Sequence, residues 1–145
     1  MGLIDMREIK FRAWNDDHYI HMNENPEEYQ WHFGECGFGI SYYDTTICKI
    51  SGGELVESEE WIELKNLIFE QFTGLHDNNG KEIYEGDIIN WGSHLMYVEW
   101  NHEFCQWYAS DIDDEYHGPL WTHLRSGELA VIIGNIHESP ELLEQ

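Results

Sequence analysis

Aspartates and histidines close to the N-terminus are the first residues with types suited to chemistry. Asp16, Asp17, His18 and His21 carry carboxylates and imidazoles, which are suitable metal ligands. His18 and His21 are three positions apart, and an odd offset on a strand sends two side chains to opposite faces. The pattern therefore favours a surface turn over a metal site, and the sequence predicts no metal or other cofactor.

A second acidic group resembles the start of a calcium-binding loop. Asp111, Asp113 and Glu115 have the spacing of the first ligands in such a loop. The loop also needs a glycine and a bidentate glutamate at positions that are occupied here by Tyr116 and Thr122. The segment therefore indicates a solvated acidic loop instead of a calcium site.

Cysteine chemistry has weak support in the sequence. Cys105 and His102 could act as nucleophile and base, but they flank an expected hairpin loop and no third, orienting group is visible. The other cysteines, Cys36 and Cys48, are widely spaced, and no CxxC pair occurs. We expect free thiols and no disulfide framework.

Tyr84, Glu85 and Asp87 offer groups for acid–base catalysis. Asp87 follows Gly86 in a turn, however, where short acids commonly accept hydrogen bonds from nearby main-chain N–H groups. An enzyme also needs its groups gathered in one pocket, and the sequence assembles no such cluster. We therefore expect a non-enzymatic protein-binding module, with a small hydrolase that uses scattered His and Asp residues as an alternative.

The net charge bears on the expected partners. The chain has 29 acidic and 7 basic residues, which gives a formal net charge of −22. After Asn66 the sequence contains two cations, Lys81 and Arg125, so this half has no basic face that could neutralise phosphates. Direct binding to nucleic acid or to an anionic membrane is not expected, whereas a basic host or phage protein would be attracted.

Two interpretations of this charge remain open. Either it confers solubility alone, or the acidic residues form a surface that mimics a nucleic-acid backbone and inhibits a basic host protein. The candidate residues for that interaction surface are Glu57, Glu59, Glu60, Asp111, Asp113 and Asp114.

Tryptophan is abundant, with seven residues in the chain. Trp91, Trp100, Trp107 and Trp121 could form a stacking platform for a single strand, but the cations that such a platform needs are missing beside them. Core packing or a protein interface is the favoured interpretation. Because an aromatic-rich chain buries more apolar area as a symmetric assembly, we also expect a homo-oligomer.

Length and hydropathy favour one soluble, cytoplasmic domain. The 145 residues suit a single core. No segment approaches the roughly 20 apolar residues that cross a bilayer, and the N-terminal residues do not form a secretion signal.

The stretch from Gln71 to Ile89 has the densest turn and strand signals. Asn79-Gly80 lies between apolar residues, which predicts a tight hairpin turn. A second turn at Glu85–Asp87 leads into an apolar strand at Ile88–Trp91. This arrangement is typical of the start of a small β-barrel.

The other segments complete a mostly β chain, with a small, strongly curved sheet or barrel-like fold and short helical turns. Alternating charged and apolar residues predict a half-buried strand at Arg7–Trp14, which packs with a barrel-like region over residues 67–143. The remaining expected elements are a returning strand at His18–Met22, an ordered loop at Asn23–Tyr43, a strand at Thr45–Ile50, an irregular or helical piece at Glu59–Leu64, a strand at Leu67–Phe72, a hairpin of Leu95–Trp100 and Phe104–Tyr108 around a three-residue loop, a central strand covered on both faces at Glu128–Ile136, and a closing turn from Ser139 to Leu143.

Three separated segments, REIKFRAW (Arg7 to Trp14), QFTGLHDNNGKEIYEGDII (Gln71 to Ile89) and IGNIHESPELL (Ile133 to Leu143), resemble the YopX family of phage and prophage proteins in order and content. The resemblance implies a mostly β, barrel-like fold and an accessory protein in a bacterial host cell. It implies no established activity, so no catalytic residue is carried over. The motif residues, to which we assign structural roles, are Trp14, Thr73, Gly74, Gly80, Tyr84, Glu85, Gly86, Asp87, Gly134, Asn135 and Pro140.

Overall fold

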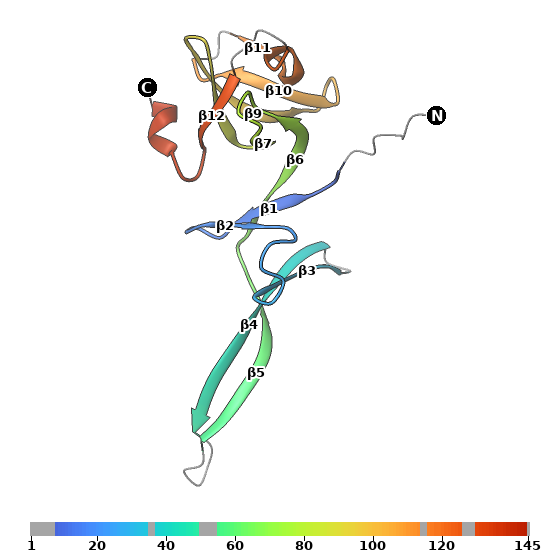
Figure 1. Ribbon diagram of the computed structural model, residues 1–145, viewed down its shortest axis with the longest axis vertical. Coiled ribbons are helices and arrows are strands. Elements are labelled where there is room, and N and C mark those ends of the chain that lie inside the picture. Colours follow the sequence, from blue (N-terminus) through green and yellow to red (C-terminus); the bar gives the residue numbers. More distant parts are fainter. Residues whose placement is uncertain (1–7, 35–36, 50–54, 114–115, 126–129, 145) are drawn as a thin grey trace, which may run out of the picture.

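The computed structural model describes residues 8–34, 37–49, 55–113, 116–125 and 130–144 (Figure 1). Within these ranges the chain forms β-strands and two short 3-10 helices, which confirms the predicted mostly β fold. The elements are β1 (Phe11–Trp14), β2 (Tyr19–His21), β3 (Tyr29–Gly34), β4 (Gly37–Lys49), β5 (Leu55–Glu63), β6 (Ile68–His76), β7 (Glu82–Tyr84), β8 (Asp87–Trp91), β9 (His94–Asn101), β10 (Gln106–Asp111), β11 (His117–Pro119), η1 (Leu120–His123), β12 (Ala130–Asn135) and η2 (Pro140–Glu144).

The strands form three antiparallel sheets, with the orders β2-β1-β6-β7, β11-β10-β9-β8-β12 and β3-β4-β5. The five-stranded sheet is curled into a half-barrel, and β6 connects it to the rest of the molecule (Figure 1). The first half of β6 pairs with β1, whereas its second half pairs with β7. Strand β6 therefore fixes the N-terminal strand against the half-barrel.

Two apolar cores hold these sheets. The larger core lies in the half-barrel and includes the fully buried Ile83, Ile89 and Met96. The smaller core joins the four-stranded sheet to the base of the β3–β4–β5 sheet and includes Ala13, Ile20 and Ile40. Burial of these side chains is the main source of stability for each part.

The predicted turn at Asn79-Gly80 is confirmed. Gly80 has a φ of 82°, and one oxygen of the Asp77 carboxylate accepts hydrogen bonds from the N–H groups of Asn79 and Lys81 at 2.9 and 2.8 Å. The other oxygen accepts the N–H of Ile132 in β12 at 2.9 Å. The Asp77 side chain therefore ties the turn to the last strand of the half-barrel.

The predictions for the segment between the N-terminal hairpin and β6 were partly wrong. The expected loop at Asn23–Tyr43 contains β3 and the first half of β4, and the expected irregular piece at Glu59–Leu64 lies almost entirely in strand β5. Long antiparallel pairing explains the difference, because β4 and β5 are in register from Ser41 and Glu63 outward. Beyond β3 these two strands form a ribbon that projects from the body (Figure 1). Residues 45–49 of the strand expected at Thr45–Ile50 belong to β4, and Ile50 lies outside the described residues.

Two predictions for the second half of the chain need correction. Strand β12 lies at the edge of its sheet and leaves Ile133 exposed, so it is not a central strand covered on both faces. In the β9–β10 hairpin, which is confirmed, Phe104 and Cys105 belong to the turn, because Gln106 is the residue that pairs with Asn101.

The alternation in the N-terminal strand misplaced two side chains. Arg12, one of the charged residues of this alternation, is buried, whereas the apolar Ile9 lies before β1 begins and is 66% exposed. The buried arginine has partners on other strands and in the turn between β7 and β8, because Glu70, the carbonyl of Glu85 and Asp87 accept hydrogen bonds from it.

Candidate functional site

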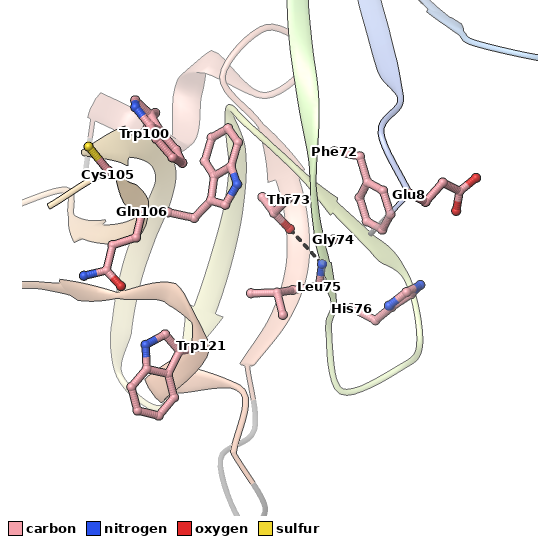
Figure 2. A pocket seen from close by; sticks show the side chains of 11 residues that line it. Glu8, Phe72, Thr73, Gly74, Leu75, His76, Trp100, Cys105, Gln106 and Trp121 are labelled. Carbon is pink, nitrogen blue, oxygen red and sulfur yellow. Dashed lines mark hydrogen bonds between the residues drawn. The ribbon is translucent and has the colours of Figure 1, made fainter. Parts of the chain in front are cut away.

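An open cleft lies between β6, the β9–β10 hairpin and η1, and its volume is about 760 Å³ (Figure 2). Leu75 of β6 points to the side of the strand on which Trp100 and Trp121 lie, while Phe72 and His76 lie on the other side. The other residues that line it are Glu8, Thr73, Gly74, Cys105, Gln106 and Trp107. Large apolar side chains with a few polar groups are typical of a binding site.

A bulge in β6 gives the cleft its floor. The register between β6 and β7 shifts between Phe72 and His76. Thr73 donates its hydroxyl to the carbonyl of Ile83 at 2.7 Å and accepts the N–H of Leu75 at 3.1 Å (Figure 2). Gly74 has a φ of 84°, a conformation that residues with a Cβ rarely adopt. Thr73 and Gly74 of the family motif therefore shape the cleft by bending its strand.

The tryptophans of the cleft come from two elements. Trp100 and Trp107 face each other across the β9–β10 hairpin in an edge-to-face pair, with ring centroids 5.1 Å apart. Trp121 of η1 is 52% exposed. Trp91 belongs to a different cluster, in which its ring packs against His94, Tyr116 and His123. The structure thus brings together three of the four tryptophans that the sequence analysis singled out.

Trp100 and Trp107 also border a second hollow of about 470 Å³, which we call the Glu85 hollow. Its other lining residues are Phe11, Phe69, Gln71, Glu85 and His102. Burial raises the pKa of the Glu85 carboxyl, and repulsion by Glu70 adds to this effect. Within the described part of the chain, Glu85 forms no ion pair.

The motif residues Tyr84, Glu85 and Asp87 contact the buried side chain of Arg12. Its Nε donates to Glu70 at 2.9 Å, and its Nη2 donates to Asp87 at 2.8 Å and to the carbonyl of Glu85 at 3.2 Å. The guanidinium also lies 4.0 and 4.7 Å from the ring centroids of Tyr19 and Tyr84. This network joins β1, β2, β6 and the β7–β8 turn.

Asp87 bonds to the main chain as well as to Arg12. Its second oxygen accepts the N–H of Tyr84 at 2.8 Å. Burial opposes the charge of Arg12, but the carboxylates of Asp87 and Glu70 raise its pKa above the ordinary value. Gly86 has a φ of 83°, and a Cβ there would come within 2.2 Å of Glu70.

The C-terminal motif residues fix the last turn against the N-terminal hairpin. Asn135 accepts the N–H groups of His137 and Glu138 at 3.0 and 2.8 Å, and the hydroxyl of Tyr19 at 3.2 Å. A Cβ on Gly134 would come within 2.5 Å of Ser139, and Pro140 begins η2, where the closing turn was predicted. Trp14 is buried, with its ring stacked on that of His137.

The expected acidic surface is divided by the fold. Glu57, Glu59 and Glu60 belong to β5 in the projecting ribbon, whereas β10, which ends at Asp111, lies in the half-barrel (Figure 1). Asp113 is exposed, and Asp114 lies outside the described residues.

Asp111 itself is 7% exposed, which corrects its assignment to an exposed surface. It lies 2.8 Å from Nδ1 of His94 and accepts the N–H of Asp113 at 3.0 Å. Partial burial opposes the charge of Asp111, yet these hydrogen bonds lower its pKa. Sequence reasoning missed this His–Asp pair because 17 positions separate the two residues.

The other candidate groups remain apart from the cleft or contribute single residues to it. His18 contacts Asp17 at 3.1 Å, whereas His21 lies 3.7 Å from Glu24. The described residues contain no group of three or more side chains that could hold a metal ion. Cys105 is an exposed thiol whose sulfur lies 3.6 Å from the carbonyl of His102, and Cys36 lies outside the described residues.

Comparison with known proteins gives a family and a fold. The family model of the YopX protein matches residues 10–144. The crystal structure of protein EF1440 from Enterococcus faecalis has 26% sequence identity and a TM-score of 0.57, and the match covers 95% of this chain and 99% of that chain.

A second crystal structure, that of protein yopX from Bacillus subtilis, also has a TM-score of 0.57. It has 14% identity, with 94% of this chain and 96% of that chain covered. No curated protein matches the sequence. In the part of the chain that the structure describes, no helix is long and apolar enough to span a membrane. Because the family model covers almost the whole sequence, this chain belongs to the YopX protein family.

Proposed function

We propose that this protein is a non-enzymatic protein-binding module that binds its partner in the cleft. We further propose that it is an accessory protein of a phage or prophage, acting in the cytoplasm of the bacterial host. The observation that carries the binding proposal is the convergence of Trp100, Trp107 and Trp121 on one open cleft. Tryptophan is enriched among the residues that dominate binding energy at protein interfaces.

The shape of the cleft favours a segment of chain as the ligand. It lies along the bulged part of β6, where Thr73, Gly74 and Leu75 line it, and the β9–β10 hairpin and η1 lie across from this strand. Trp121 is half exposed without a ligand, so a partner side chain that covers it removes apolar surface from water. Gln106 supplies polar groups that can hydrogen-bond to a peptide main chain.

Binding can be tested with an array of 12-residue peptides of random sequence, probed with the labelled protein. We expect a set of peptides to bind, and we expect Trp121→Ala to weaken the best of them about 30-fold, which corresponds to a loss of about 2 kcal/mol. Phe104→Ala is the matched control, since Phe104 is an equally exposed aromatic residue that lines neither hollow. Failure of every peptide to bind, or equal effects of the two variants, would contradict the proposal.

The nucleic-acid mimic is a second candidate, supported by the ribbon. Four of the nine residues of β5 are glutamates, at positions 57, 59, 60 and 63. At about 3.3 Å per residue, Glu57 and Glu59 are roughly 6.6 Å apart along the strand, a spacing suited to a row of charges. Retention of a basic DNA-binding protein from host lysate at low salt, with loss of its DNA binding, would favour the mimic.

The small hydrolase draws its support from the pair of His94 and Asp111. A carboxylate that holds an imidazole is part of many catalytic groups. Hydrolysis of a general ester substrate that is abolished by His94→Ala would favour this class over the binding module.

A further inference from the structure

Resting on the proposed function, we infer that the Glu85 hollow binds a lysine or arginine side chain of the partner segment that occupies the cleft. The two spaces are adjacent, because Trp100 and Trp107 line both of them. Trp107 is buried, so a bound segment that lies over Trp100 can place one side chain in the cleft and another in the hollow. The hollow then selects for the charge of the partner, while the cleft supplies apolar contact.

The walls of the hollow have the chemistry that a cationic side chain requires. Four aromatic residues, Phe11, Phe69, Trp100 and Trp107, contribute to it. Aromatic faces attract ammonium and guanidinium groups, and tryptophan is the strongest of them. The same rings also pack against the methylene groups of a long basic side chain.

Glu85 supplies the negative charge. It is half-buried and forms no ion pair with any described residue. The main-chain N–H of Gln71 and the charge of Arg12 both stabilise this carboxylate. The hydrogen bonds of the Arg12 side chain, however, go to Glu70, to Asp87 and to the main-chain carbonyl of Glu85. A partly desolvated carboxylate in an acidic region gains more from a cation than an exposed one does.

The charge of the whole chain supports a basic partner. With a net charge of −22, the protein attracts cationic segments over long range and repels acidic ones. A second copy of the chain is disfavoured as the occupant for the same reason.

The test is a double-mutant cycle with peptides taken from a random 12-residue array. The first expected result is that the binding peptides contain lysine or arginine more often than the array as a whole. For the tightest binder, Glu85→Gln should weaken binding about tenfold, because the amide oxygen still accepts a hydrogen bond but the carboxylate charge that pairs with the basic side chain is lost. Replacement of the peptide's basic residue by norleucine should have a similar effect.

The coupling energy between Glu85→Gln in the protein and norleucine in the peptide shows whether the inference holds. We expect that the norleucine peptide binds the wild-type protein and Glu85→Gln equally well, because each change removes the same interaction. Glu103→Gln is the matched control, since Glu103 is an exposed glutamate in the turn of the same hairpin and lines neither space. This variant should bind the lysine peptide like the wild type.

Two results would overturn the inference, and they can be told apart. If peptides bind and depend on Trp121, but show no basic residue and no effect of Glu85→Gln, the hollow is not a cation site and the proposed function stands. If no peptide binds at all, both the inference and the proposed function fail. Near-ultraviolet circular dichroism of each variant shows that the fold is kept.

Discussion

Replacement of Arg12 by methionine tests the network that joins the family motif. Methionine keeps much of the apolar length of the side chain but removes the guanidinium. Glu70 and Asp87, which are 3% and 2% exposed, then lose their cation while they remain buried. The structure therefore predicts that Arg12→Met causes a large loss of stability, although the alternating sequence pattern gives no sign that Arg12 is buried.

The size of the loss follows from the burial of the pair. Breaking a buried ion pair by removing one partner costs about 3–5 kcal/mol, since it leaves an uncompensated charge. For a chain of this length, about 3 °C of melting temperature is lost per kcal/mol, so a decrease of roughly 10–15 °C is expected. Lys81→Met is the control, because Lys81 is exposed, and it should change stability by less than about 0.5 kcal/mol.

Urea unfolding followed by tryptophan fluorescence measures this loss, and its pH dependence identifies the cause. Burial raises the pKa of Asp87 in the wild type, while Arg12 and the Tyr84 N–H oppose that effect. Without Arg12 the folded-state pKa rises further above its unfolded value of about 3.9, so the folded state binds more protons above that pH. The stability of Arg12→Met then decreases as the pH rises from the unfolded-state pKa of Asp87 to its higher folded-state pKa. The stability difference between Arg12→Met and the wild type should therefore be smaller near pH 4 than at pH 7.

A loss below about 1 kcal/mol at pH 7, or a deficit that does not change between pH 7 and pH 4, would refute the reasoning. The first result would show that Glu70 and Asp87 find other partners or solvent. The second would show that the loss comes from packing alone. Arg12→Met combined with Glu70→Gln and Asp87→Asn should be more stable than Arg12→Met alone, since the unpaired charges are gone.

Three further predictions follow from the geometry. Burial lowers the pKa of His21, so the unfolded state binds more protons than the folded state below about pH 6.5. The stability should therefore increase with pH through this range. Urea unfolding at pH 5.5 and 7.5 should show a smaller difference for His21→Gln than for the wild type. Gly86→Ala should cost more than the roughly 1–2 kcal/mol expected for Gly80→Ala by thermal unfolding, because both glycines have positive φ but only at Gly86 would the Cβ meet Glu70. Self-association should appear in light scattering as a mass above that of the monomer, and this mass should increase with salt. The free edge of β5 is acidic, and salt screens the repulsion between the edges of two copies. A monomer mass at all salt concentrations would contradict this prediction.

Local patterns in the sequence were sufficient for part of the fold. The Asn79-Gly80 pair predicts its turn because few residues adopt positive φ, and the apolar runs on both sides of Asn101 predict the β9–β10 hairpin. These features depend on residues that are close together in the chain. The family motif segments likewise contain Arg12, Tyr84 and Asp87 of the Arg12 network, but not Tyr19 or Glu70.

The site depended on contacts between distant segments. Arg12 and Asp87 are 75 positions apart, and alternation alone placed the arginine on a polar face. The cleft forms where β6, the β9–β10 hairpin and η1 meet. Glu85 belongs to the proposed cation site because Phe11 and Trp100, which are distant in the sequence, line the same hollow. The sequence by itself determined a mostly β, acidic, tryptophan-rich chain with defined turns. Tertiary structure alone decided which charges are buried, paired or open to a partner, because desolvation and pairing arise from packing between segments and leave no periodic pattern in the sequence.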